Sequence, residues 1–168
     1  MEPHSEARLQ VVHPVLADKV RQMAATLLQE GIEIRVVQGL RTYQEQAALY
    51  AQGRTAPGSI VTNAKPGFSY HNAGLAVDCI PGVRGSNPWQ PNWTDQVHDQ
   101  LTPDYARMVQ VGKSLDLFSG SDFGSITDDP HFQMTGSFPA GCPPAPARDL
   151  MAKDDLKGVW AMAGLAVS

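Results

Sequence analysis

The chain has 168 residues, 42% of them apolar and 18% charged, a composition typical of one folded domain with a core rather than of a disordered segment. Thirteen basic and 17 acidic residues give a net charge of −4, which argues against non-specific nucleic-acid binding. No run of about 18 apolar residues occurs, which excludes a membrane-spanning helix. Cys79 and Cys142 are too few for a disulfide scaffold or a cysteine-based zinc site.

Signals for helices occur at three places in the chain. After Pro14, a residue suited to the first helical position, apolar side chains recur at steps of three and four. Thr42 and Glu45 have the spacing of a capping box, and Pro103 again suits the start of a helix. These signals predict helices over residues 14–30, 42–52 and 102–115.

Strands and loops fill most of the remaining chain. Strand patterns, alternating or continuously apolar, occur at residues 32–36, 74–80 and 131–135. Segments rich in Gly, Pro, Ser or Asn predict loops at residues 53–67, 81–93 and 119–125. The tail, residues 141–168, begins with a cluster of prolines and ends in a weakly helical stretch that contains Trp160. Because helices and strands alternate irregularly, we expect an α+β fold and a single domain over residues 1–168.

Two of the five histidines lie among acidic residues in patterns that suit a metal ion. His71 is in a loop seven residues before Asp78, which lies on the strand that follows. His131 begins another strand, three residues after Asp128. Two imidazoles and one carboxylate leave a fourth position for water, as in catalytic zinc sites. The alternative is that these are ordinary loop histidines beside acids.

The remaining candidate ligands have simpler interpretations. His4, His13 and His98 have no ligand-like neighbours, so we interpret them as ordinary exposed side chains. Side chains alternate across a strand, so Cys79 points away from the face that carries Asp78. We therefore expect Cys79 to be a thiol of the core.

Residues 69–78 (Ser-x-His-x-x-Gly-x-Ala-x-Asp) and 128–133 (Asp-x-Pro-His-Phe-Gln) resemble motifs of the D-alanyl-D-alanine carboxypeptidase and L-alanyl-D-glutamate endopeptidase family of peptidoglycan hydrolases. This family includes VanY-type carboxypeptidases and the endopeptidase endolysins of bacteriophages. The resemblance extends to residues 39–46 and 62–67, covers about residues 14–135, and in pattern is closest to the endolysin-like endopeptidases. It implies the small α+β fold shared with the hedgehog signalling domain, with zinc at a central antiparallel sheet.

The resemblance also implies a role for individual residues. By position in the motifs, His71, Asp78 and His131 are the ligands of a zinc ion. Asp128 matches the family's catalytic acid/base. Arg41 matches an arginine that faces the substrate carbonyl, where its guanidinium could stabilise the developing oxyanion.

Further positions match the family less specifically. Gln46 and Ser69 match positions near the substrate, and we expect a supporting hydrogen-bonding role for them.

Two alternatives concern the catalytic residues. The acid/base could be the neighbouring Asp129, and Arg41 could instead form a surface pair with a carboxylate such as that of Glu45.

The chain departs from the family pattern in two respects. Phe118 and Phe123 stand where relatives often carry Trp, which keeps the apolar bulk but removes an indole donor and bears on substrate preference. The tail, residues 141–168, is too short to be a cell-wall-binding module.

From these residues we predict a zinc-dependent peptidoglycan hydrolase that cleaves stem peptides between L-alanine and D-glutamate, as endolysin-like enzymes do. The alternatives are a D,D-carboxypeptidase that removes terminal D-alanine and a catalytically silent, zinc-bearing wall-binding module. We expect a monomer that binds the stem peptide and neither binds nucleic acid nor spans a membrane. No secretory signal is visible, which predicts synthesis in the cytoplasm and lysin-like release to the cell wall.

Overall fold

The computed structural model describes residues 1–91, 102–124 and 127–167. Parts of the sequence predictions lie outside these ranges: residues 92 and 93 of one predicted loop, His98, and residue 125 of another predicted loop. Within the described ranges, no helix combines the length and the apolar character needed to cross a membrane. The chain forms two compact units, which consist of Met1–Gly39 with Val77–Met134 and of Leu40–Ala76 with Thr135–Ser168.

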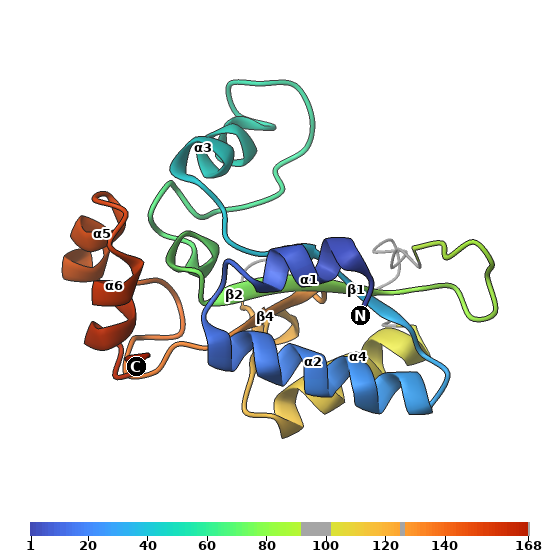
Figure 1. The fold of residues 1–168 in the computed structure, drawn as a ribbon. Helices are drawn as coiled ribbons and strands as arrows, with labels where there is room; N and C mark the ends of the chain where they lie inside the picture. Colours follow the sequence, from blue (N-terminus) through green and yellow to red (C-terminus); the bar gives the residue numbers. More distant parts are fainter. Residues whose placement is uncertain (92–101, 125–126, 168) are drawn as a thin grey trace. The chain divides into compact units, whose positions relative to one another are not determined.

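The first unit contains the sheet and, in its described residues, three α-helices. Its helices are α1 (Pro3–Leu9), α2 (Pro14–Gln29), α4 (Pro103–Ser114) and the short 3-10 helix η3 (Gly120–Asp122). Its strands are β1 (Ile34–Gln38), β2 (Ala76–Pro81), β3 (Phe118–Ser119) and β4 (His131–Gln133). Helices α2 and α4 lie side by side (Figure 1).

The four strands form one sheet in the order β1-β2-β4-β3. Strand β1 pairs antiparallel with β2, where Val36 lies opposite Cys79, and β3 pairs antiparallel with β4. Next to β4, the N–H of Cys79 donates to the carbonyl of Pro130 at 2.8 Å. The α+β fold with an antiparallel sheet that the sequence predicts is therefore confirmed.

The predicted helices at residues 14–30 and 102–115 are confirmed as α2 and α4. The apolar positions that predicted α2 form its buried face: Leu16, Val20, Met23 and Leu27. The prediction that His13 is exposed is wrong. Its side chain is 1% exposed, and its Nδ1 accepts the N–H of Val15 and so caps the start of α2.

Several boundaries differ from the sequence predictions, among them the start of the second strand, which begins at Ala76 rather than at residue 74. The first strand begins at Ile34 rather than at residue 32, because the N–H of Ile32 donates to Leu27 and belongs to the end of α2. The segment predicted as a loop at residues 119–125 begins with Ser119 of β3 and continues as η3. The last strand ends at Gln133, two residues earlier than predicted.

Helix α1, which the sequence analysis missed, covers the outer edge of β1 (Figure 1). The hydroxyl of Ser5 accepts the N–H of Val36 at 3.0 Å and donates to a carboxylate oxygen of Glu2 at 2.6 Å. Glu2 also accepts the N–H groups of His4 and Ser5 and so caps α1. Because strand edges carry unpaired backbone groups, this contact satisfies a donor that would otherwise stay unpaired.

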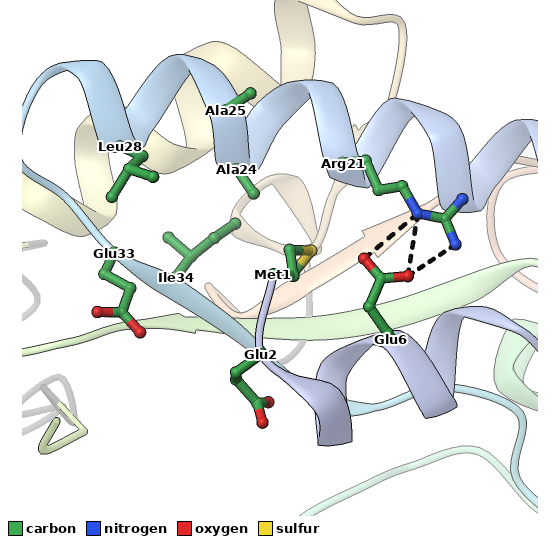
Figure 2. Close-up of a pocket in the computed structure, with 9 residues that line it drawn as sticks. All are labelled: Met1, Glu2, Glu6, Arg21, Ala24, Ala25, Leu28, Glu33 and Ile34. Carbon is green, nitrogen blue, oxygen red and sulfur yellow. Dashed lines mark hydrogen bonds and ion pairs between the residues drawn. The ribbon is translucent and has the colours of Figure 1, made fainter.

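A cleft of about 270 Å³ lies between α1, α2 and β1 (Figure 2). Its apolar lining includes Ala24, Leu28 and Ile34. Beside them Arg21 of α2 forms an ion pair with Glu6 of α1, with 2.9 Å between Nη2 and Oε2 (Figure 2). This ion pair joins α1 to α2, and the hydrogen bonds from Arg21 lower the pKa of Glu6.

The second unit is helical in its described residues. Its helices are α3 (Tyr43–Ala51), the 3-10 helix η1 (Tyr70–Ala73), α5 (Ala145–Met151) and α6 (Leu156–Met162). The predicted capping box of α3 is confirmed, because Thr42 Oγ1 accepts the N–H of Glu45 at 3.2 Å and the Glu45 carboxylate accepts the N–H of Thr42 at 2.7 Å. The tail that the sequence predicted as weakly helical forms α5 and α6.

The contact between α1 and β1 gives a test of the fold. Replacing Ser5, which is fully buried, with alanine leaves the N–H of Val36 unpaired in the interior. We expect Ser5→Ala to lower the free energy of unfolding by about 1–3 kcal/mol. Urea titration of the variant measures this loss. The exposed Ser137→Ala serves as the control, with a change below about 0.5 kcal/mol, and equal effects in both variants would contradict the role of Ser5.

Candidate active site

Strands β2 and β4 bring an acidic residue and a histidine together in the first unit. Nδ1 of His131 lies 3.2 Å from Oδ1 of Asp78, although 53 positions separate them in the sequence. The other ring nitrogen, Nε2, lies 2.9 Å from Oε1 of Gln133, two residues further along β4. Both ring nitrogens of this buried histidine therefore face oxygen atoms.

The surroundings of His131 are anionic. Burial by itself lowers the pKa of His131, but the hydrogen bond and charge of Asp78, the charge of Asp128 and the contact with Gln133 raise it overall. Such an environment favours a cation, either a proton or a metal ion. Cys79 is fully buried, and its burial raises its pKa well above the usual range, as expected for a thiol of the core.

The segment before His131 is held by the backbone of Gly120. The N–H of Asp128 donates to the carbonyl of Gly120 at 3.0 Å, and the carbonyl of Asp128 accepts the N–H of His131 at 3.1 Å. A Cβ atom at position 120 would lie 2.2 Å from the carbonyl oxygen of Asp128. Only glycine allows this approach, so position 120 fixes where Asp128 and His131 lie relative to each other.

The neighbouring acid, Asp129, has a different environment. Its Oδ1 is buried and has no hydrogen-bond partner among the described residues, and burial raises its pKa. The charge of Asp128, by contrast, acts on His131. Asp128 therefore contributes to the anionic surroundings of His131, and its assignment rather than that of Asp129 as the acid/base stays a prediction.

In the second unit, His71 lies on the short helix η1. The hydroxyl of Ser69 caps this helix by accepting the N–H of His71 at 3.3 Å. Gly74 ends it with a positive φ of 63°, a conformation that favours glycine. From the tail, the indole of Trp160 in α6 donates to the carbonyl of Ala73 at 2.8 Å. The predicted supporting residue Ser69 thus acts on the backbone of the predicted ligand.

Arg41 lies beside the same helix and is held through its backbone and its side chain. Its N–H donates to the carbonyl of His71 at 3.0 Å, and its carbonyl accepts Nδ2 of Asn72 at 2.7 Å. Its Nη1 donates to Oε1 of Gln46 at 2.9 Å. Gln46, which is fully buried, donates in turn to the carbonyl of Ala64 in the loop at residues 53–67.

The alternative partner of Arg41, Glu45, is engaged by the capping box. Hydrogen bonds from the backbone and side chain of Thr42 lower the pKa of Glu45, and the charge of Arg41 adds a smaller effect in the same direction. Glu45 therefore has a structural role at the start of α3, while Gln46 orients the guanidinium of Arg41.

A cavity of about 420 Å³ lies in the second unit beside Arg41. Its lining includes Tyr43 and Asn72 together with Met151 and Leu156 from the tail. The sequence analysis assigned no role to the tail, and the structure makes it part of the unit that carries Arg41 and His71.

Among the described residues, one group of His, Cys, Asp and Glu side chains could hold a metal ion: His71, Asp78 and His131. One ligand atom of each lies within 4.8 Å of those of the other two. Two imidazoles and one carboxylate are a donor set that fits zinc. The three residues that the sequence motifs single out are therefore close together, and their role as zinc ligands stays a prediction.

Two aromatic side chains lie close to His131. The rings of Phe118 and Phe123 stack with 5.8 Å between their centroids, and the ring of Phe123 lies 5.3 Å from that of His131. These are the positions where the sequence departs from the family pattern, so phenylalanine here forms an apolar wall beside the histidine.

Two polar residues at this site had no role assigned from the sequence. Asn72 holds the backbone of Arg41, and Gln133 contacts His131. Both are nearly fully buried. Asn72 is adjacent to a predicted ligand. Gln133 ends the motif at residues 128–133 and lies on the same face of its strand as His131.

Comparison with known proteins places this chain in a family of peptidases. Residues 9–122 match the family model described as VanY, D-alanyl-D-alanine carboxypeptidase. The chain belongs to this family, and the resemblance noted in its sequence is confirmed. Arg41, His71 and Asp78 lie within the matched residues, whereas Asp128 and His131 follow them.

Individual relatives agree with this assignment. The peptidoglycan L-alanyl-D-glutamate endopeptidase CwlK of Bacillus subtilis is 34% identical over 140 residues, which cover 79% of this chain and 83% of that protein. The L-Ala-D-Glu endopeptidase ChiX of Serratia marcescens has a similar structure, with a TM-score of 0.52 and 21% identity over 80% of this chain and 89% of that one. The L,D-carboxypeptidase DacB of Streptococcus pneumoniae has a TM-score of 0.50 and 15% identity over 92% of this chain and 78% of that one. The similarity to these two structures shows that this chain has the same fold as they do.

The close approach at Gly120 gives a test of the site. In Gly120→Ala the new Cβ meets the Asp128 backbone, so we expect the free energy of unfolding to fall by about 1–3 kcal/mol and zinc affinity to fall with it, because His131 is displaced. Urea titration and zinc titration measure the two effects. Gly124→Ala is the matched control, since a Cβ there meets no described atom within 4 Å. If Gly120→Ala keeps the parent's stability and zinc affinity, position 120 does not fix the site.

Proposed function

We propose that the protein is a zinc-dependent peptidoglycan peptidase that cleaves the stem peptide between L-alanine and D-glutamate. The observation that carries this proposal is the group of His71, Asp78 and His131, with ligand atoms within 4.8 Å of one another. Membership of the VanY family and the similarity to an L-alanyl-D-glutamate endopeptidase supply the substrate class.

In this proposal His71, Asp78 and His131 hold the zinc ion. When bound, zinc lowers the pKa of water and polarises a peptide carbonyl. The surroundings of His131 suit a cation, since Asp78 and Asp128 both place negative charge near its ring. Ser69 and Trp160 contribute indirectly, because they hold the two ends of η1, the helix that carries His71.

Asp128 is the proton carrier of the proposed reaction. Its carboxylate accepts a proton from the water molecule that attacks the scissile carbonyl carbon. As the C–N bond breaks, Asp128 passes that proton to the departing amine, so the carboxylate is regenerated at the end of the cycle. The backbone contacts with Gly120 and His131 hold Asp128 at one place during both transfers.

Arg41 stabilises the negative charge that develops on the carbonyl oxygen. Gln46 accepts one N–H of its guanidinium, and Asn72 and His71 hold its backbone. A guanidinium held in this way needs little reorganisation when the charge appears, which is the condition for strong oxyanion stabilisation.

Two alternatives compete with this function. A D,D-carboxypeptidase that removes terminal D-alanine is supported by the description of the family model, whereas the relative with 34% identity favours the endopeptidase. A catalytically silent zinc-bearing module is disfavoured because the chain has both Asp128 and Arg41, which a binding module does not need. The endolysin-like character, the release from the cytoplasm and the monomeric state stay predictions.

Digestion of purified peptidoglycan tests the proposed function. We expect new amino termini at D-glutamate, identified by mass spectrometry of the released fragments, and loss of the activity after treatment with a chelator, with recovery on addition of zinc. Release of free D-alanine would instead identify a carboxypeptidase. Binding to peptidoglycan without any cleavage would identify the silent module.

The two adjacent acids can be separated by substitution. Asp128→Asn removes the proton acceptor but no metal ligand, so we expect zinc content to stay at the parent's level while turnover falls by about 10²- to 10⁴-fold. Asp129→Asn is the matched control and should change turnover far less. Zinc analysis and fragment release measure the two quantities, and the opposite ranking of the variants would assign the acid/base role to Asp129.

Arg41 can be tested in the same assay. Loss of an oxyanion donor costs about 10²- to 10³-fold in the chemical step, so Arg41→Ala should lose this factor mainly in kcat. Arg41→Lys should recover only part, because an ammonium lacks the planar fork. Zinc content should be unchanged in both variants. A parent-like kcat in Arg41→Ala would show that the guanidinium does not act on the oxyanion.

A further inference from the structure

We propose that Lys65 is a specificity-determining residue that binds a carboxylate of the substrate next to the scissile bond. In a stem peptide cleaved between L-alanine and D-glutamate, this group is the free carboxylate of D-glutamate, since the other carboxyl group continues the peptide chain. This role rests on the proposed function and deepens it, because it names the chemical group by which the site would select its substrate.

The stretch of chain that carries Arg41 is cationic. Residues 40–76 have a net charge of +2, whereas the whole chain has a net charge of −4. The acidic and basic side chains of this stretch are Arg41, Arg54, Lys65 and Glu45. The single acid, Glu45, is engaged in the capping box of α3. This part of the second unit therefore favours an anionic group on a substrate.

The guanidinium of Arg54 is used within the loop at residues 53–67. It donates to the carbonyl of Thr62 at 3.0 Å and to Oδ1 of Asn63 at 3.0 Å, and it lies 4.1 Å from the centre of the Tyr50 ring. These contacts hold the loop against the end of α3. Arg54 thus has a structural role.

The ammonium of Lys65 is available to a ligand. Its side chain is exposed, and within the described parts of the chain it forms no hydrogen bond or ion pair. Arg41 is assigned to the developing oxyanion in the proposed reaction. Lys65 is therefore the cation of this stretch that remains for a second anionic group.

The backbone just before Lys65 is tied to Arg41 by a buried amide. Nε2 of Gln46 donates to the carbonyl of Ala64 at 2.8 Å, and Oε1 of the same side chain accepts Nη1 of Arg41 at 2.9 Å. Gln46 is fully buried, so water has poor access to replace either partner. One amide group therefore separates the guanidinium of Arg41 from the residue that precedes Lys65.

The backbone just after Lys65 is tied to Arg41 by a second buried amide. Oδ1 of Asn72 accepts the N–H of Gly67 at 3.0 Å, while its Nδ2 donates to the carbonyl of Arg41 at 2.7 Å. The carbonyl of Lys65 itself accepts the N–H of Phe68 at 2.9 Å. The chain on both sides of Lys65 is thus fixed relative to Arg41, and only the lysine side chain itself is left to adjust to a ligand.

The substrate has its charges in the matching order. In the proposed reaction Arg41 acts on the carbonyl oxygen of L-alanine, and the next residue, D-glutamate, carries the free carboxylate. An ammonium on a long, flexible stem acts as a point charge, which suits a carboxylate on a side branch of the peptide. Because this ion pair is already formed in the bound substrate, we expect it to act on KM rather than on kcat.

Two soluble stem peptides that differ only at the free carboxyl group of D-glutamate test this role. One has the carboxylate and the other the neutral carboxamide. We expect the parent to have a KM about three- to tenfold lower for the carboxylate peptide, the range of a charge-assisted contact at a solvated site. The kcat values of the two peptides should agree within about twofold.

Variants of Lys65 assign the preference to its charge. Lys65→Gln should raise the KM of the carboxylate peptide to that of the carboxamide peptide, Lys65→Arg should keep most of the preference, and Lys65→Glu should reverse it. Lys157→Gln is the matched control, since it removes an exposed cation from α6 of the same unit and changes the net charge equally. It should keep the preference of the parent.

The outcomes separate the role of Lys65 from the proposed function. If the parent cleaves both peptides between L-alanine and D-glutamate with equal KM values, or if Lys65→Gln keeps the preference, only the role of Lys65 fails. If the parent cleaves neither peptide, the proposed function fails. Calorimetric titration of the parent and Lys65→Gln with both peptides then decides the role of Lys65, and equal affinities of the parent for the two peptides would overturn it.

Discussion

The pairing of β2 with β4 is the contact on which the candidate active site depends. The N–H of Cys79 donates to the carbonyl of Pro130, so the residues on either side of this bond, Asp78 and His131, lie next to each other across the sheet. These two residues are 53 positions apart in the sequence, and no local signal brings them together. The sheet therefore brings together two of the three predicted zinc ligands.

Each candidate site residue is held by backbone contacts of its neighbours rather than by its own packing alone. Gly120 holds the segment that carries Asp128, and the cap of Ser69 and the indole of Trp160 hold the helix that carries His71. Asn72 holds the backbone of Arg41. Reactions that move a proton and stabilise a new charge require groups placed to within about half an ångström, and such networks provide this accuracy.

The sequence predicted those features that depend on local patterns. The periodicity of α2, the capping box of α3 and the α+β class follow from side-chain spacing, and the structure has all three. The motifs around His71 and His131 led to the family because their spacing is specific. The motif selects Asp128 rather than Asp129 as the candidate acid/base, but the sequence could not show that Gly120 folds back on the backbone of Asp128.

The features that the sequence analysis missed depend on contacts made in the folded protein. Helix α1 is short, and it is held by the bond of Ser5 with the edge of β1, the cap of Glu2 and the ion pair of Glu6 with Arg21 rather than by a long apolar stripe. His13 looks like an exposed histidine until its cap on α2 is seen. Gln133 ends the motif at residues 128–133 and shares a strand face with His131, but its contact with the imidazole is seen only in the folded protein.

The most direct test of this account is X-ray absorption spectroscopy of the full-length protein loaded with one equivalent of zinc. The account predicts a first shell of nitrogen and oxygen atoms at about 2.0–2.2 Å, with the outer-shell scattering of two imidazoles. A sulfur atom at about 2.3 Å, or scattering from fewer than two imidazoles, would contradict the assignment of His71, Asp78 and His131 as the zinc ligands.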